Sequence, residues 1–368
     1  MLDPTFVRAQ FPAFSDPSLS GWGFFENAGG SYTCSQVIDR LTRFYHQRKV
    51  QPYAPYPASA AGGAEMNEAR SRLSALLGVD RDELSFGPST SQNTYVLAQA
   101  FRSFLSPGEA IIVTNQDHEA NSGVWRRLAE EGIEIREWCI DPETGHLDPA
   151  ALEDLLDETV RLVCFPHCSN VVGEINPVTE ITALAHAAGA FTCVDGVSYA
   201  PHGLPDVGAL GCDIYLFSAY KTFGPHQGIM VIRRALAQAL PNQAHFFNGE
   251  SLYKRFTPAG PDHAQIAACA GMVDYIETLA AHHDCTPADI ASLMQQHESA
   301  LLQPLLDWLS GHKGVRLLGP TCAEQRAPTV ALALDRPAEP VAAQLAQHRI
   351  MAGGGEFYAV RPLEALGG

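Results

Sequence analysis

Short apolar runs alternate with segments of helical periodicity from about residue 65 to residue 234. Runs such as AIIVT (110–114) and RLVCFPH (161–167) are apolar throughout, which is typical of strands buried on both faces of a parallel sheet. Further strands are expected at 133–140, 191–196, 213–221 and 228–234. Helices are expected between them at 65–78, 91–105, 121–132, 148–157 and 180–189, and Asp148 with Pro149 forms a good start for the fourth.

This alternation predicts an α/β domain with a mostly parallel sheet covered on both faces. The pattern changes at about residue 261, where two long helical stretches begin (264–283 and 288–312). A strand at 329–334 and a helix at 340–348 follow. We therefore predict a large domain over residues 20–260, and a smaller α+β domain built from residues 1–19 and 261–368.

The composition narrows the possible partners. The chain has 368 residues, 46% of them hydrophobic, and a net charge of −17. Such a charge repels nucleic-acid phosphates and anionic lipids, so neither nucleic acid nor a membrane is an expected partner. Nothing resembles a signal peptide or a membrane span. Nine scattered cysteines with no CxxC pair indicate reduced thiols, a cytoplasmic location and no metal site.

Polar residues follow several predicted strands at their carboxyl ends, where open α/β sheets bind ligands. They are Asp117 and His118, Asn170, Asp195, and Ser218 with Lys221. Ser89 and Thr90 precede a helix, whose free N–H groups favour a phosphate. Each residue alone reads as a turn former, a helix cap or a surface group. A lysine at the end of a buried strand is nevertheless costly unless it is paired, neutralised or used covalently.

Pyridoxal phosphate is a cofactor that requires this combination of groups. It needs a lysine for a Schiff base (an aldimine) and a carboxylate that keeps its pyridine nitrogen protonated. It also needs a phosphate cradle and a flat group stacked on its ring. Lys221, Asp195, His118 and the hydroxyl groups of Thr90 and Ser218 match these needs.

The sequence resembles the class V aminotransferase family of fold-type I pyridoxal-phosphate enzymes. Within that family it is similar to the branch of cysteine desulfurase-like proteins, selenocysteine lyases and isopenicillin N epimerase-like proteins. Segments 24–45, 117–125, 166–181, 193–233 and 259–276 carry the resemblance, together with spacings of 77 residues from His118 to Asp195 and 26 from Asp195 to Lys221. It implies a seven-stranded-type sheet in the large domain and a homodimer.

By position, the resemblance implies that Lys221 forms the aldimine and moves the substrate's α-proton. Asp195 would pair with the pyridine nitrogen, and His118 would stack on the ring and assist proton transfer. Asn170 would face the phenolic oxygen. Thr90 and Ser218, with help from Ser89, would hold the phosphate.

Several positions depart from the family pattern. Ser198 lies where desulfurases have a glutamine, Tyr220 where they have a phosphate-binding histidine, and Gly260 where a threonine reaches the partner subunit's phosphate. Asn27, Ala28 and Gly29 would lie at the substrate mouth.

The C-terminal segment departs furthest from the family pattern. Desulfurases carry a nucleophilic cysteine in a mobile loop, but residues 350–368 contain no cysteine. Cys168 and Cys322 are weak substitutes. The chain also ends before the strand that carries the family's carboxylate-binding arginine, so the small domain is expected to be truncated. Arg361 is the remaining candidate for that contact.

The expected function is a pyridoxal-phosphate lyase, epimerase or desulfurase-like enzyme that acts on a small amino acid. An aminotransferase with the same cofactor is an alternative. A catalytically decayed protein that binds a cofactor or a partner is another, although the intact Lys221, Asp195 and His118 argue against decay.

Overall fold

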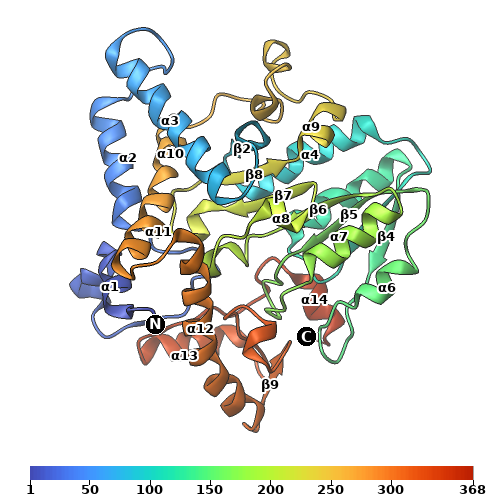
Figure 1. Cartoon of the computed structure of the whole chain (residues 1–368). Coiled ribbons are helices and arrows are strands. Elements are labelled where there is room, and N and C mark those ends of the chain that lie inside the picture. Colours follow the sequence, from blue (N-terminus) through green and yellow to red (C-terminus); the bar gives the residue numbers. More distant parts are fainter. Residues whose placement is uncertain (368) are drawn as a thin grey trace.

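The computed structural model describes residues 1–367. A seven-stranded sheet forms the centre of the molecule (Figure 1). Its strand order is β2-β8-β7-β6-β5-β3-β4. The strands are β2 (Leu84–Gly87), β3 (Ala110–Thr114), β4 (Glu134–Trp138), β5 (Val160–Pro166), β6 (Phe191–Asp195), β7 (Ile214–Ser218) and β8 (Gly228–Ile232). Strand β8 pairs antiparallel with both β2 and β7, and the other neighbouring strands pair in parallel. The predicted mostly parallel sheet is therefore confirmed.

Both faces of the sheet are buried. Ile111 and Val113 of β3 pack into one apolar core with Leu97, whereas Ile112 belongs to the core on the opposite face. Helices and connecting segments cover both faces of the sheet (Figure 1). The helices are α1 (Pro4–Ala9), α2 (Ser35–Gln47), α3 (Pro57–Leu76), α4 (Thr90–Phe104), α5 (Gly123–Arg126), α6 (Pro149–Glu153), α7 (Val178–Ala187), α8 (Val207–Leu210), α9 (Arg234–Ala239), α10 (His263–Ala268), α11 (Ala270–His282), α12 (Pro287–Ser310), α13 (Ala338–Gln347) and α14 (Val360–Ala365).

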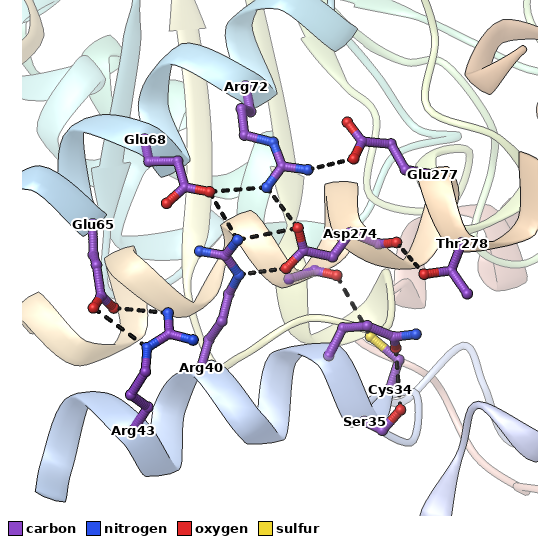
Figure 2. Close-up of polar contacts among 12 residues, drawn as sticks. Cys34, Ser35, Arg40, Arg43, Glu65, Glu68, Arg72, Asp274, Glu277 and Thr278 are labelled. Carbon is purple, nitrogen blue, oxygen red and sulfur yellow. Dashed lines mark hydrogen bonds and ion pairs between the residues drawn. The ribbon is translucent and has the colours of Figure 1, made fainter. Parts of the chain in front are cut away.

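An ionic cluster ties α2, α3 and α11 together (Figure 2). Arg40 of α2, whose side chain is 11% exposed, contacts Asp274 of α11 and Glu68 of α3. Arg72 of α3 bonds to the same Asp274 at 2.6 Å and to Glu277 at 2.7 Å. These shared carboxylates fix the three helices beside the sheet, so α10 and α11 pack on α2 and α3.

The C-terminal part has small sheets of its own. Strands β9 (Val315–Leu318) and β10 (Ala331–Leu334) form an antiparallel pair next to α12. Strand β1 (Gly23–Phe24) pairs in parallel with β11 (Ile350–Met351), so the residues after Phe24 lie beside the C-terminal segment. The division of the chain at residues 260/261 stays a prediction. None of the helices within residues 1–367 combines the length and apolar character needed to cross a bilayer.

Two expected elements differ from the structure. Helix α3 begins at Pro57, earlier than the expected residue 65, because the small residues 58–64 extend it in front of the amphipathic stretch. The helix expected at 121–132 shrinks to the four residues of α5 between 3₁₀ turns. Here the Thr94 hydroxyl of α4 donates a hydrogen bond to the carbonyl of Ala120 at 2.8 Å, so a tertiary contact helps to set the local backbone.

Candidate active site

A cavity opens at the carboxyl ends of β3, β5, β6 and β7, where the sequence predicts a site. Its walls are formed by Thr90, Ser91, Asp117, His118, Ala120, Cys168, Asn170, Asp195, Val197, Ser198, Ser218, Tyr220 and Lys221. Eight of the ten expected cofactor residues are therefore brought together; the other two, Ser89 and Gly260, do not line the cavity.

Lys221 and Asp195 provide the opposite charges of the cavity. Lys221 ends the 3₁₀ turn Ala219–Lys221 that follows β7, and burial lowers its pKa although Asp195 and Glu26 oppose this shift. Asp195 is the last residue of β6 and is 5% exposed. Its Oδ1 accepts a hydrogen bond from the Val197 N–H at 2.8 Å. Burial raises the pKa of Asp195 to about 6, against this bond and the Lys221 charge.

His118 is held in one orientation by its own loop. Its Nδ1 accepts a hydrogen bond from the Ala120 N–H at 3.0 Å, so the neutral ring carries its proton on Nε2. Burial, followed by the nearby Lys221 charge, lowers the pKa of His118 to about 4. A neutral, fixed imidazole is suited to stack on an aromatic ligand.

Asp117 is a cavity residue that the sequence reasoning placed after β3 but did not assign to the site. Its carboxylate accepts hydrogen bonds from the His118 N–H at 2.8 Å and from Asn121 Nδ2 at 2.7 Å. Burial and the neighbouring Asp195 raise its pKa well above the ordinary value. The signal that could have found it is its position immediately before His118 at a strand end.

Two hydroxyl groups meet at the start of α4. The Oγ1 of Thr90 and the Oγ of Ser218 are 2.8 Å apart. Ser89 is instead the N-cap of α4, and its side chain accepts a hydrogen bond from the Gln92 N–H at 3.1 Å. A Cβ at Gly228 would lie 2.8 Å from the Thr90 backbone nitrogen, so this glycine lets β8 approach the helix start. Hydroxyl groups at a helix N-terminus form a favourable phosphate site.

Asn170 and Tyr220 line the mouth of the cavity. Asn170 Nδ2 donates a hydrogen bond to the carbonyl of Phe357 at 3.0 Å, while its buried Oδ1 has no partner among residues 1–367. The ring of Tyr220 stacks on His226 with centroids 4.6 Å apart. A lysine, a buried carboxylate, a fixed imidazole, paired hydroxyl groups and an unpaired amide oxygen together fit pyridoxal phosphate.

None of the expected substrate residues lines this cavity, so their role stays a prediction. Asn27, Ala28 and Gly29 form a turn in which the Gly29 N–H donates to the carbonyl of Glu26 at 3.2 Å. Arg361 lies in a neighbouring cavity of about 550 Å³, where its Nε is 3.4 Å from a carboxylate oxygen of Glu119. Arg361 does not line the first cavity. Its contact with a substrate carboxylate stays a prediction.

Residues 352–361, here called the strap, cross the space between the two cavities. The carbonyl of Tyr358 accepts a hydrogen bond from the Glu119 N–H at 2.8 Å, and the Tyr358 ring lies 5.6 Å from the His118 ring. Phe357 and Tyr358 both have left-handed backbone conformations, with φ of 51° and 55°. The strap therefore places aromatic residues beside the site.

Neither of the two candidate cysteines forms an activated thiol. Cys168 lines the cavity but is buried, and burial raises its pKa to about 12. Cys322 is exposed and precedes the 3₁₀ turn Ala323–Gln325, away from the cavity walls. A buried thiol with a raised pKa is a poor nucleophile because the thiolate is the reactive form.

The chain is similar to several known proteins. A family model described as aminotransferase class-V matches residues 23–365. An aminotransferase-like protein of Gibberella zeae is 33% identical over 339 residues, which cover 89% of this chain and 81% of that protein. A cysteine desulfurase of Yersinia pestis is 32% identical over 337 residues, which cover 86% and 79%. The structure of a cysteine desulfurase from Thermococcus onnurineus has the same fold, with a TM-score of 0.86, 24% identity, and coverage of 100% of this chain and 91% of that chain.

Proposed function

The chain belongs to the class-V aminotransferase family, and on this basis we propose that its cavity acts on a small amino acid through Lys221. The protein is a pyridoxal-phosphate enzyme of the cysteine desulfurase-like type. When bound, the cofactor supplies an electron sink for negative charge that develops at the substrate's α-carbon. The residues of the chain must hold that group, orient the substrate and move one proton.

Asp195 and Lys221 carry the central roles. The Asp195 carboxylate is proposed to pair with the cofactor's ring nitrogen and to favour the protonated form of that nitrogen. Burial lowers the pKa of Lys221, which increases the fraction of neutral amine. A neutral Nζ can bond to an aldehyde, and can later accept the proton of the substrate's α-carbon.

The remaining cavity residues are proposed to position the cofactor. Thr90 and Ser218 would hold the phosphate at the start of α4, and Tyr220 would contribute its hydroxyl. His118 would stack on the ring, which its neutral state permits. Asn170 and Ser198 would face the phenolic oxygen.

The observation that carries this proposal is that Lys221 and Asp195 meet in one cavity with a hydroxyl pair at a helix N-terminus. Transamination is the second candidate. The similarity to an aminotransferase-like protein and the absence of cysteine from the strap favour it.

A substrate screen on cofactor-loaded protein separates the two candidates. Sulfide, alanine, pyruvate, racemised amino acid and amino-group transfer to a 2-oxo acid are scored separately. Amino transfer to a 2-oxo acid as the main product would favour transamination. The absence of every product from a loaded protein would contradict both candidates and favour the decayed alternative.

We also propose a homodimer located in the cytoplasm. The exposed segment 258–260 supports the dimer, because no atom of the described residues 1–367 lies within 4 Å of a Cβ placed at Gly260. This leaves space for a partner's phosphate group. The nine free cysteines support a reducing compartment. A monomer that binds the cofactor tightly in a sedimentation experiment would contradict the dimer.

A further inference from the structure

Glu26 is a carboxylate next to the expected substrate residues, with no cationic partner within residues 1–367. It follows β1 in the turn that contains Asn27 and Gly29, and it is half-buried. Within residues 1–367 it forms neither an ion pair nor a side-chain hydrogen bond. Its carboxylate lies against the backbone of two glycines.

Two glycines form a slot for this carboxylate. A Cβ at Gly29 would lie 2.8 Å from Glu26 Oε1, and a Cβ at Gly353 of the strap would lie 2.8 Å from Oε2. Both positions are closer than a side chain tolerates, so a residue other than glycine would displace the carboxylate. The pairing of β1 with β11 brings these two segments together.

The same turn is fixed to the residues that carry Lys221. The backbone N–H and the hydroxyl of Ser31 both donate hydrogen bonds to the carbonyl of Tyr220, at 3.0 Å each. The Ser31 hydroxyl also accepts a bond from the Phe223 N–H at 2.8 Å. Glu26 is thus held at a set position relative to Lys221, and its negative charge, with that of Asp195, raises the pKa of Lys221 against the effect of burial.

We propose that Glu26 receives the ammonium group of the incoming amino acid. The inference rests on the proposed function. Asp195 is assigned to the cofactor, and Lys221 loses its ammonium group when it bonds to an aldehyde. Glu26 then remains as a carboxylate without an ion-pair partner among residues 1–367.

An incoming amino acid supplies that missing cation. Its amino group would have to approach the Lys221 nitrogen, because it would replace that nitrogen on the aldehyde carbon of the cofactor; the proton that it gives up would pass to the released Lys221 amine. The ligand class is therefore an amino acid with a protonated amino group. Glu26 distinguishes such an amino acid from the carboxylic acid that lacks only the amino group.

The test compares alanine with propionate, which lacks only the amino group, on cofactor-loaded Glu26→Gln protein. Glu364→Gln is the control, because it removes an exposed carboxylate from α14 near the mouth. We expect the Kd for alanine to rise about tenfold in Glu26→Gln, the order expected for a charged hydrogen-bonded contact. The Kd for propionate should change less than twofold, and the control should match the parent protein for both ligands.

Two further measurements keep the inference falsifiable. Gly353→Ala retains the charge but displaces the carboxylate, and should weaken alanine binding while leaving propionate binding unchanged. The midpoint of the pH titration of the bound cofactor's visible absorbance should fall in Glu26→Gln, because a removed negative charge no longer stabilises a protonated nitrogen.

The outcomes separate the two claims. Equal alanine affinities and equal midpoints in parent and Glu26→Gln proteins, with the cofactor bound to both, would overturn the role of Glu26 alone. A parent protein that binds no pyridoxal phosphate would overturn the proposed function, and with it this inference.

Discussion

Replacement of Asp195 by asparagine should stabilise the cofactor-free protein while removing its activity. Burial raises the pKa of this carboxyl group from 3.8 to about 6. A difference of about 2 pKa units corresponds to an upper value of about 3 kcal/mol, at 1.36 kcal/mol per unit. Because the pKa of Asp195 is higher in the folded state, its ionised carboxylate lowers the free energy of unfolding, and this loss is complete above about pH 6. Below about pH 4 it is protonated in both states and costs nothing.

The assay is thermal unfolding of cofactor-free parent and Asp195→Asn proteins at pH 8 and pH 4. Asparagine keeps an oxygen that can accept the Val197 hydrogen bond and removes the charge. An unfolding entropy of about 2 cal/mol/K per residue then predicts a rise in Tm of about 4 °C at pH 8. At pH 4 the two proteins should unfold together. Saturating pyridoxal phosphate should raise the Tm of the parent protein more than that of the variant, because only the carboxylate favours a protonated ring nitrogen.

The reasoning would be refuted by a variant whose Tm at pH 8 is equal to or below that of the parent protein. It would also be refuted by a variant that turns over at the parental rate with cofactor bound, since Asp195 would then be a turn residue.

Three further predictions concern other parts of the molecule. Asp274→Asn should lower the free energy of unfolding by about 2 kcal/mol, because it leaves the mostly buried Arg40 without one of its carboxylates, and urea titration measures this. Burial opposes the ionisation of Asp274, but bonds from Arg40 and Arg72 outweigh it and lower its pKa, so the loss should shrink as the pH falls toward 3. The protein should release sulfide or alanine from cysteine slowly or not at all, and Cys322→Ser should not change this rate. A turnover of about 10 per second that Cys322→Ser abolishes would contradict this prediction. His118 should stay neutral down to about pH 4 in the cofactor-free protein. An NMR titration with a midpoint of about 6.5 would contradict the lowering of its pKa by burial.

The sheet was predictable where buried strands are uniformly apolar. The run at 110–114 coincides with β3, because five buried residues between polar segments admit few alternatives. Strand β2 was missed because only two of its four residues, Leu84 and Phe86, are apolar. The shortness of α5 was missed because the Ala120 carbonyl accepts a hydrogen bond from Thr94 of α4, a tertiary effect that periodicity does not reveal.

The site was predictable to the extent that strand ends and family positions define it. Lys221, Asp195 and His118 lie in one cavity, as expected from their places after strands. Asp117 and Glu26 were not assigned. The place of Asp117 in the cavity depends on side-chain packing. The place of Glu26 depends on the pairing of β1 with β11 across more than three hundred residues. Ser89 was placed near a phosphate but caps α4, the ordinary role of a serine before a helix.

The central claim is that Lys221 bonds covalently to pyridoxal phosphate, and chemical trapping tests it most directly. The loaded protein is reduced with borohydride, digested and analysed by mass spectrometry, which distinguishes the four lysines of the chain. The account predicts a yellow protein, the cofactor's mass on Lys221 alone, and a folded but inactive Lys221→Ala variant without the visible absorbance. The cofactor on another lysine, or an unchanged spectrum and activity in Lys221→Ala, would contradict it.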